Sequence, residues 1–145
     1  MIMLDKQNLA ITLFLLFFVP LVGCGEVLDP DYKPVRGTVL LDGQPLADAQ
    51  VTFVPLGEGS SGSGFTNEQG EYTLYYAARR PGAKAGENQV FITKSKPTSG
   101  KKGERAFSEA DSELLPARYN RQTELTATVE DKRNIFDFQL ESKKK

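Results

Sequence analysis

From Val35 onward, apolar residues recur at every second position, which is the spacing of a strand with one buried face. The first such run, VRGTVLL, ends at the dipeptide Asp42-Gly43, which suits a tight turn between two strands. Later runs place their apolar residues at Ala49, Val51, Phe53; Tyr72, Leu74, Tyr76; Val90, Ile92; Leu125, Ala127, Val129; and Phe136, Phe138, Leu140. No long segment carries a helical stripe, so we predict an all-β, antiparallel sandwich of about seven strands.

Two turns between these runs are predicted from residue type. Asp42, Gly43 and Pro45 mark the first turn, and Asn67 and Gly70 mark the second. Glycine adopts a positive φ at little cost, so both glycines are expected where the backbone takes the left-handed conformation. These residues are assigned to folding rather than to chemistry.

The beginning of the chain has the pattern of an export signal. An apolar core, LAITLFLLFFV, follows a weakly charged start and is interrupted by Pro20. A membrane-spanning helix needs roughly 20 apolar residues, so this run is too short for one. We therefore expect residues 1–23 to be a cleavable signal peptide.

The only cysteine, Cys24, directly follows Leu21, Val22 and Gly23, and these four residues resemble a bacterial lipobox. The resemblance implies that the thiol receives a diacylglyceryl group and that cleavage occurs before Cys24. It also implies an exported lipoprotein anchored to a membrane of the bacterial cell envelope, facing the periplasm or the cell surface. Two other interpretations stay open: an ordinary signal peptidase removes Cys24 at a small-x-small site, or the thiol is simply buried.

Residues 24–34 are expected to be the lipidated N-terminus and a tether, because GEVLDPDYKP has two prolines, three acids and no apolar period. Asp29 and Asp31 suggest a calcium site, but no further oxygen ligands follow them, which favours a solvated linker. The sandwich is expected over residues 35–142, with a basic tail at 143–145. The segment 96–115 is long for a loop, and the sequence leaves open whether it is functional or disordered.

Several blocks of sequence resemble the carboxypeptidase regulatory-like domain, a sandwich of the transthyretin or prealbumin-like type. The blocks are Gly37-Thr38-Val39, Asp42-Gly43-Gln44-Pro45-Leu46, Ala49-Gln50-Val51-Thr52-Phe53, and the stretch from Thr66 to Leu74. Asn67 stands where the family more often has Asp, and the family's later P-G-x-Y-x-V block is only partly present. The resemblance covers residues 35–140 and implies a Greek-key topology without a shared active site.

The amino-acid composition excludes most common types of catalytic site. The 145 residues include no histidine and one cysteine, so there is no Ser-His or Cys-His pair and no ligand set for structural zinc. The 18 basic and 19 acidic residues nearly cancel, so no overall field attracts nucleic acid. We predict a protein that is not an enzyme, has no cofactor and no metal, and serves as a binding or structural module.

Tyr75 and Phe91 are the candidate binding residues, because both fall on the face opposite the core pattern. With Tyr76 they suggest a platform for stacking on sugar rings, while ordinary cross-strand packing is the competing interpretation. The expected partner, besides the membrane, is an envelope protein or a polysaccharide.

The alternative function is an envelope hydrolase or accessory subunit that acts on carbohydrate through paired carboxylates. The candidate carboxylates are Glu68, Glu71, Asp111 and Glu113.

Overall fold

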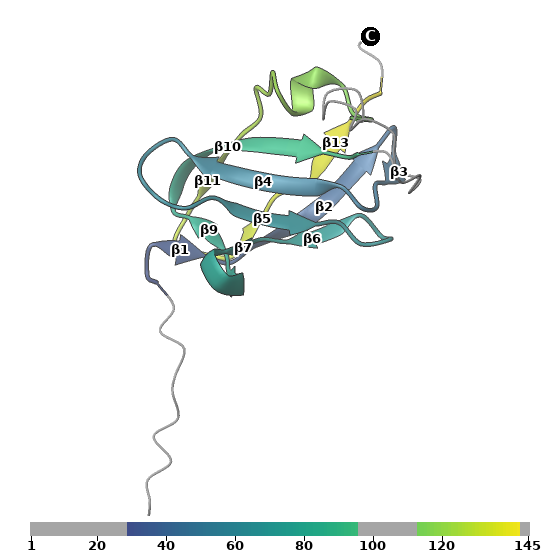
Figure 1. Ribbon diagram of the computed structural model, residues 1–145. Coiled ribbons are helices and arrows are strands. Elements are labelled where there is room, and N and C mark those ends of the chain that lie inside the picture. Colours follow the sequence, from purple (N-terminus) through teal and green to yellow (C-terminus); the bar gives the residue numbers. More distant parts are fainter. Residues whose placement is uncertain (1–28, 96–112, 143–145) are drawn as a thin grey trace, which may run out of the picture.

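The computed structural model describes residues 29–95 and 113–142 (Figure 1). The predicted signal peptide at 1–23, the lipobox with Cys24, most of the long loop and the tail at 143–145 lie outside the described residues. Within these two ranges, no helix is long and apolar enough to cross a bilayer.

The described chain is all-β, as predicted, with only two short 3-10 helices, η2 (Ala77–Arg79) and η3 (Ala117–Tyr119). Six strands form the larger sheet in the order β11-β10-β4-β5-β7-β8, and all their pairs are antiparallel. Their bounds are β4 (Gln50–Pro55), β5 (Gly62–Phe65), β7 (Tyr75–Tyr76), β8 (Arg80–Pro81), β10 (Gly86–Thr93) and β11 (Thr126–Val129).

The second sheet is built around β2 (Val35–Leu41), and it corrects the prediction of a purely antiparallel fold. Strands β3 (Gln44–Pro45) and β6 (Glu71–Thr73) pair with β2 antiparallel, whereas β12 (Asn134–Ile135) and β13 (Phe138–Leu140) run parallel to it. The chain crosses from β11 in the other sheet to β12 in this one, so no tight hairpin joins the last strands to β2 and antiparallel pairing is not imposed.

Short breaks also divide the expected runs of residues. The described ranges contain thirteen strands, several of them two residues long, where about seven were expected from spacing. A period of two in the sequence continues through such breaks, because a residue can keep its inward direction where the ladder of backbone hydrogen bonds is interrupted.

The hydrophobic core contains side chains from both sheets. Phe53 is fully buried at its centre, with its ring centroid 5.5 Å from that of Phe136 and 6.3 Å from that of Phe138. Phe136 and Phe138 are only partly buried, so the final segment fills the core less completely than its alternation predicts. The other predicted inward side chains are buried, apart from the partly buried Leu41 and Leu125: Val35, Val39, Ala49, Val51, Tyr72, Leu74, Tyr76, Val90, Ile92, Ala127, Val129 and Leu140.

Both predicted turns have the expected residues in the left-handed conformation. Asp42 and Gly43 have φ values of 51° and 82°, and they join β2 to β3, which ends with Pro45. In the second turn, the side-chain oxygen of Asn67 accepts hydrogen bonds from the backbone of Gln69 and Glu71, at 3.0 and 2.9 Å.

Gly70 closes that second turn with a φ of 76°. A Cβ atom at this position would lie 2.5 Å from the carbonyl oxygen of Val39, so space and backbone conformation both require glycine there.

The part of the tether that the structure describes is packed, which corrects the expectation of a free linker. Tyr32–Lys33 forms β1 and pairs antiparallel with β9 (Ala83–Lys84). The ring of Tyr32 stacks on Tyr76 with a centroid separation of 3.7 Å, and its hydroxyl accepts a hydrogen bond of 2.7 Å from the backbone of Ser60. The folded domain therefore begins at least as early as Tyr32, not at residue 35.

Asp31 has a partner that accounts for it without calcium. The ammonium group of Lys84 lies 2.7 Å from its carboxylate, and Lys84 also lies over the ring of Tyr32. Within the described ranges, no three His, Cys, Asp or Glu side chains gather in a way that could hold a metal ion.

Candidate functional site

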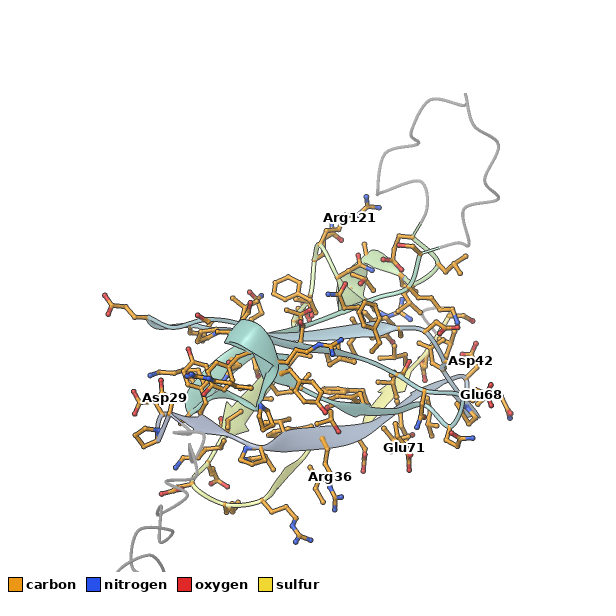
Figure 2. All side chains as sticks on the ribbon, turned by 60° about the horizontal axis from the view of Figure 1, so that its bottom comes forward. Asp29, Arg36, Asp42, Glu68, Glu71 and Arg121 are labelled. Carbon is orange, nitrogen blue, oxygen red and sulfur yellow. The ribbon has the colours of Figure 1, made fainter. Side chains whose placement is uncertain are left out.

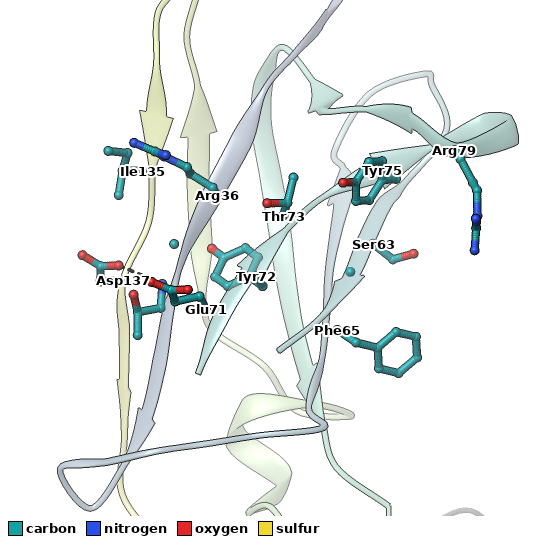
Figure 3. Close-up of a pocket in the computed structure, with 13 residues that line it drawn as sticks. Arg36, Ser63, Phe65, Glu71, Tyr72, Thr73, Tyr75, Arg79, Ile135 and Asp137 are labelled. Atoms are coloured by element: carbon teal, nitrogen blue, oxygen red, sulfur yellow. Dashed lines mark hydrogen bonds between the residues drawn. The ribbon is translucent and has the colours of Figure 1, made fainter. Parts of the chain in front are cut away.

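An open groove of about 1060 Å³ lies where the edges of the two sheets meet along β6 (Figure 3). Its volume lies just above the range of roughly 300–1,000 Å³ that is common for ligand sites. The strand β6 forms the floor, β2 and the chain after β12 form one wall, and β5 and β7 form the other. The side chains at the groove include Arg36, Phe65, Glu71, Tyr75, Arg79, Ile135 and Asp137.

The groove exists because the chain changes sheets within three residues. Thr73 ends β6 in one sheet, and Tyr75 begins β7 in the other. Leu74, between them, is fully buried, and its backbone is fixed by hydrogen bonds to Val35 and Gly82, at 3.0 and 2.8 Å. Alternation then turns the neighbours of Leu74 outward, so they line the groove.

A glycine on each side lets other segments approach this crossing closely. A Cβ atom on Gly64 of β5 would lie 2.1 Å from the carbonyl oxygen of Thr73. One on Gly37 of β2 would lie 1.8 Å from the carbonyl oxygen of Phe136. The same carbonyl of Phe136 accepts a hydrogen bond of 2.8 Å from the hydroxyl of Tyr72. The backbone before Asp137 is thereby held over the wall of the groove.

Tyr72 remains a protonated phenol in this position. Burial, and to a lesser degree the nearby negative charge of Asp137, raises the pKa of its hydroxyl. Its role is therefore to donate a hydrogen bond beneath the groove rather than to exchange protons with a ligand.

Large apolar side chains are exposed along the groove. Phe65 is 69% exposed, Ile135 51% and Tyr75 46%. The sequence placed Tyr75 on an outward face correctly, but it missed Phe65. The signal was present, because the alternation in GSGF sets Phe65 and Ser63 on one side of the strand, but two glycines left little apolar pattern to detect.

Phe91 lies on the same outer sheet face as Tyr75, as predicted, but at a distance from the groove. The strand register puts Phe91 opposite Thr52, Thr52 opposite Ser63, and Ser63 opposite Tyr75. Phe91 is half-buried, whereas Tyr76 points inward and is buried under Tyr32. The structure thus retains Tyr75 and Phe91 as surface candidates and removes Tyr76.

Two carboxylates line the groove, and each accepts a hydrogen bond from a nearby group. An oxygen of Glu71 accepts one of 3.1 Å from the side-chain amide of Asn67. An oxygen of Asp137 accepts one of 2.8 Å from the backbone of Thr38. Both carboxylates are therefore held in place by the fold.

The carboxylates chosen from the sequence do not assemble as a group within the described ranges. Of the four, Glu71 lines the groove, while Asp111 lies outside the described residues. Figure 2 shows Glu68 at the far end of the molecule near Asp42, away from Asp29. An oxygen of Glu113 accepts hydrogen bonds from the backbone of Lys94 and Leu115, at 2.9 and 2.8 Å.

Two arginines stand at the groove with their guanidinium groups free. Arg36 and Arg79 are exposed, and neither side chain forms a hydrogen bond or ion pair within the part of the chain that the structure describes. Arg79 has a φ of 67°, an uncommon conformation for a residue with a side chain. Figure 2 shows Arg36 on the same side of the molecule as Glu71.

Comparison with known proteins gives no match for this chain. No protein-family model matches the chain, and no curated protein and no solved structure matches it. What the groove binds has to be inferred from its own residues.

Proposed function

We propose that this chain is a lipid-anchored protein of the bacterial cell envelope whose β-sandwich is a non-catalytic module that binds an envelope partner. One observation carries the binding role: Phe65, Tyr75 and Ile135 are exposed together around a single groove. Exposed apolar groups that gather at a concave surface are typical of interaction sites, whereas scattered ones are ordinary.

The anchoring role rests on the sequence from Leu21 to Cys24 and on the length of chain that follows it. Cys24 and Tyr32, where β1 begins, are eight residues apart, and such a segment spans at most about 29 Å when fully extended. Since the chain is packed on the domain from β1 onward, an acylated Cys24 would hold the module close to the bilayer.

The proposal also includes a Greek-key, prealbumin-like sandwich related to carboxypeptidase regulatory-like domains. Support comes from the sequence blocks at the two turns and from the left-handed residues Asp42, Gly43 and Gly70 within them. Such a domain would bring no shared active site, in line with a chain that contains no histidine.

The anchor and the binding site are tested by separate measurements. Cys24→Ser is expected to release the protein from membranes, and intact mass of the parent should show an acyl increment on residue 24. A mature protein without that increment would refute the anchor.

For the binding site, Cys24→Ser protein should co-sediment with isolated envelopes. Adding Phe65→Ala and Tyr75→Ala is expected to reduce this binding at least about tenfold, because truncating central aromatic residues removes most of an interface's affinity. Leu56→Ala is the matched control, since Leu56 is exposed but does not line the groove. Equal loss in all variants would refute the site.

A second function has one observation in its favour. Glu71 and Asp137 line the same groove as the aromatic side chains, which is the setting in which paired carboxylates hydrolyse a glycosidic bond. New reducing ends released from a polysaccharide by the parent, and not by Glu71→Gln or Asp137→Asn, would replace the binding role with a hydrolytic one.

A further inference from the structure

The outer face of the six-stranded sheet carries no charged side chain over its three central rows. The rows follow the strand register and hold ten residues, none of them buried. We call these ten the uncharged face: Thr126, Gln89 and Val54; Phe91, Thr52, Ser63 and Tyr75; Thr93, Gln50 and Phe65. Charged residues make up 26% of the chain, and solvent-facing positions are where they usually occur, so their absence here is a specific property.

Charges return at the borders of this face. Glu87, two residues before Gln89 in β10, is the first charged residue at one end. Arg79 follows Tyr75 at the other end, at the rim of the groove. The uncharged face and the groove share Ser63, Phe65 and Tyr75, so a long ligand could lie across both.

The residue types on this face match one kind of ligand. Threonine, serine and glutamine side chains donate and accept neutral hydrogen bonds, while Phe65, Tyr75 and Phe91 offer ring faces. Phe91 and Tyr75 are three strand spacings apart, or about 14 Å, so one small molecule cannot touch both rings. The ligand must be extended, uncharged and rich in hydroxyl groups, with apolar C–H surfaces that stack on aromatic rings.

We propose that the uncharged face binds a neutral polysaccharide, with Phe65 and Tyr75 as its principal stacking residues. This inference rests on the proposed binding function and names its ligand class. Nucleic acids and anionic polymers are bound mainly through lysine and arginine, which the ten positions lack. A lipid surface is equally unsuited, because at least half of these residues are polar and none is basic.

The test is native electrophoresis of the full chain, purified in detergent, through gels that contain a dissolved polysaccharide. The neutral probes are dextran, a soluble β-1,3-glucan, hydroxyethylcellulose and a mannan, and the anionic probe is polygalacturonate. We expect at least one neutral probe to retard the parent, and Phe65→Ala with Tyr75→Ala to weaken the dissociation constant at least tenfold. The control Leu56→Ala should match the parent, and salt should have little effect because no charge takes part.

Three outcomes would overturn the inference. The first is retardation by no neutral probe. The second is retardation by polygalacturonate that falls with salt and is lost in Arg36→Ala and Arg79→Ala but not in Phe65→Ala and Tyr75→Ala. The third is a dimer of the parent that Phe65→Ala dissociates, which would assign the face to a second copy of this chain. Thermal melts of all variants confirm that they fold.

These arms are separate from the test of the anchor. Retardation by a neutral probe, together with an intact mass that shows no acyl group, would retain the ligand and refute the lipid anchor. An acylated protein that no probe retards would do the reverse.

Discussion

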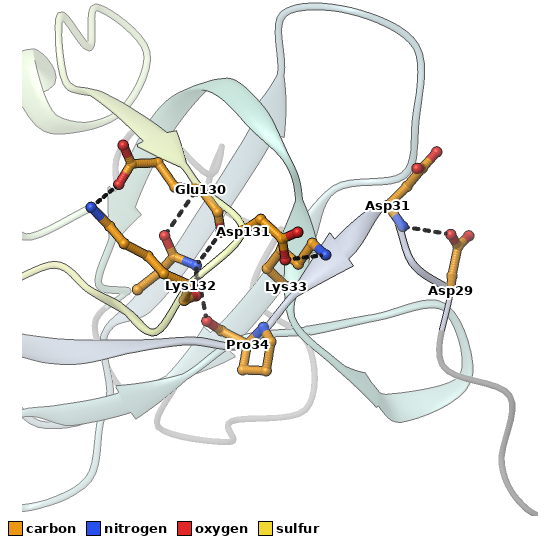
Figure 4. A network of polar contacts seen from close by, with 8 residues as sticks. Asp29, Asp31, Lys33, Pro34, Glu130, Asp131 and Lys132 are labelled. Carbon is orange, nitrogen blue, oxygen red and sulfur yellow. Dashed lines mark hydrogen bonds and ion pairs between the residues drawn. The ribbon is translucent and has the colours of Figure 1, made fainter.

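The N-terminal end of the domain and the uncharged face use their surfaces in opposite ways. Around β1, all three ion pairs found in the described ranges occur together: Lys33 with Asp131, Lys84 with Asp31, and Lys132 with Glu130. Figure 4 shows the first and the third of these pairs. Across the uncharged face there is none. Two of the three pairs join the segment around β1 to other segments, whereas Lys132 and Glu130 lie two residues apart in one loop, and each surface pair contributes little energy. A face left without charge is therefore available for contacts of another kind.

The side chain of Asn134 connects two further segments at the N-terminal end of the domain by hydrogen bonds. Its side-chain amide donates to the carbonyl oxygens of Lys132 and Glu130, at 2.8 and 3.0 Å, and reaches Pro34 at 3.4 Å (Figure 4). The loop after β11 is thereby joined to the segment that leads into β2. No comparable polar bridge is found among the residues described on the uncharged face, apart from Gln89 reaching Thr123.

The variant with the largest expected effect, Phe53→Ala, should destabilise both the N-terminal end of the domain and the uncharged face. Phe53→Ala should lower the free energy of unfolding by about 3–5 kcal/mol, because the two sheets share this fully buried ring and its loss leaves a cavity. Urea denaturation followed by circular dichroism measures the change. If the variant were as stable as the parent, the two sheets would not depend on a common core.

Tyr32→Ala acts on the N-terminal end alone. Loss of the stacking on Tyr76 and of the hydrogen bond from Ser60 should destabilise the domain by about 1–3 kcal/mol. Hydrogen exchange should increase at β9 and remain unchanged across β10 and β4. Uniform protection throughout, with an unaltered melting temperature, would mean that β1 is not part of the folded unit.

Asp31 makes the same end sensitive to acid. The hydrogen bond and positive charge of Lys84 lower the pKa of Asp31 below its ordinary value of 3.8. A carboxyl whose pKa is depressed on folding stabilises the protein above its unfolded pKa, and this contribution is lost as the pH falls through the folded value. The melting temperature of Asp31→Asn should therefore fall less than that of the parent between pH 5 and pH 2. Asp29→Asn is the comparison, because the carboxylate of Asp29 accepts a hydrogen bond of 3.0 Å from the backbone of Asp31.

The smallest effect on stability is expected on the uncharged face. Thr52→Lys should change the free energy of unfolding by less than about 1 kcal/mol, because Thr52 faces outward and a lysine can extend its ammonium group into water. Retardation by neutral polysaccharide should nevertheless weaken, since the new charge lies between Phe91 and Tyr75. Unchanged binding would show that the ligand does not cross the middle row.

The sequence predicted which way residues face better than which strands are neighbours. A period of two placed Val51, Phe53, Val90 and Ile92 inward, because alternation is a local property of extended chain. It could not reveal that β13 runs parallel to β2, since pairing direction depends on the path of the whole chain.

The same limit explains what was missed at the surface. Tyr32 is a single aromatic residue among charges and prolines, so no pattern showed that it packs on Tyr76. The period of two turns Asp137 outward, but only the close approach of Phe136 to Gly37 brings Asp137 to the groove with Glu71. The groove residues come from five separate segments, and no local sequence pattern predicts that these segments lie close together in the fold.

The parallel pairing of β13 with β2 has a consequence for how the protein is made. The backbone of Thr38 bonds to Asp137, 99 residues later, and that of Ser142 bonds back to Asp42, 100 residues earlier. The central strand of its sheet is among the first parts of the domain to leave the ribosome, and its neighbour is among the last. Contacts so distant in sequence form late, so the domain cannot complete its fold until β13 and Ser142 have left the ribosome. Until then β2 lacks the parallel neighbour β13 that completes its sheet.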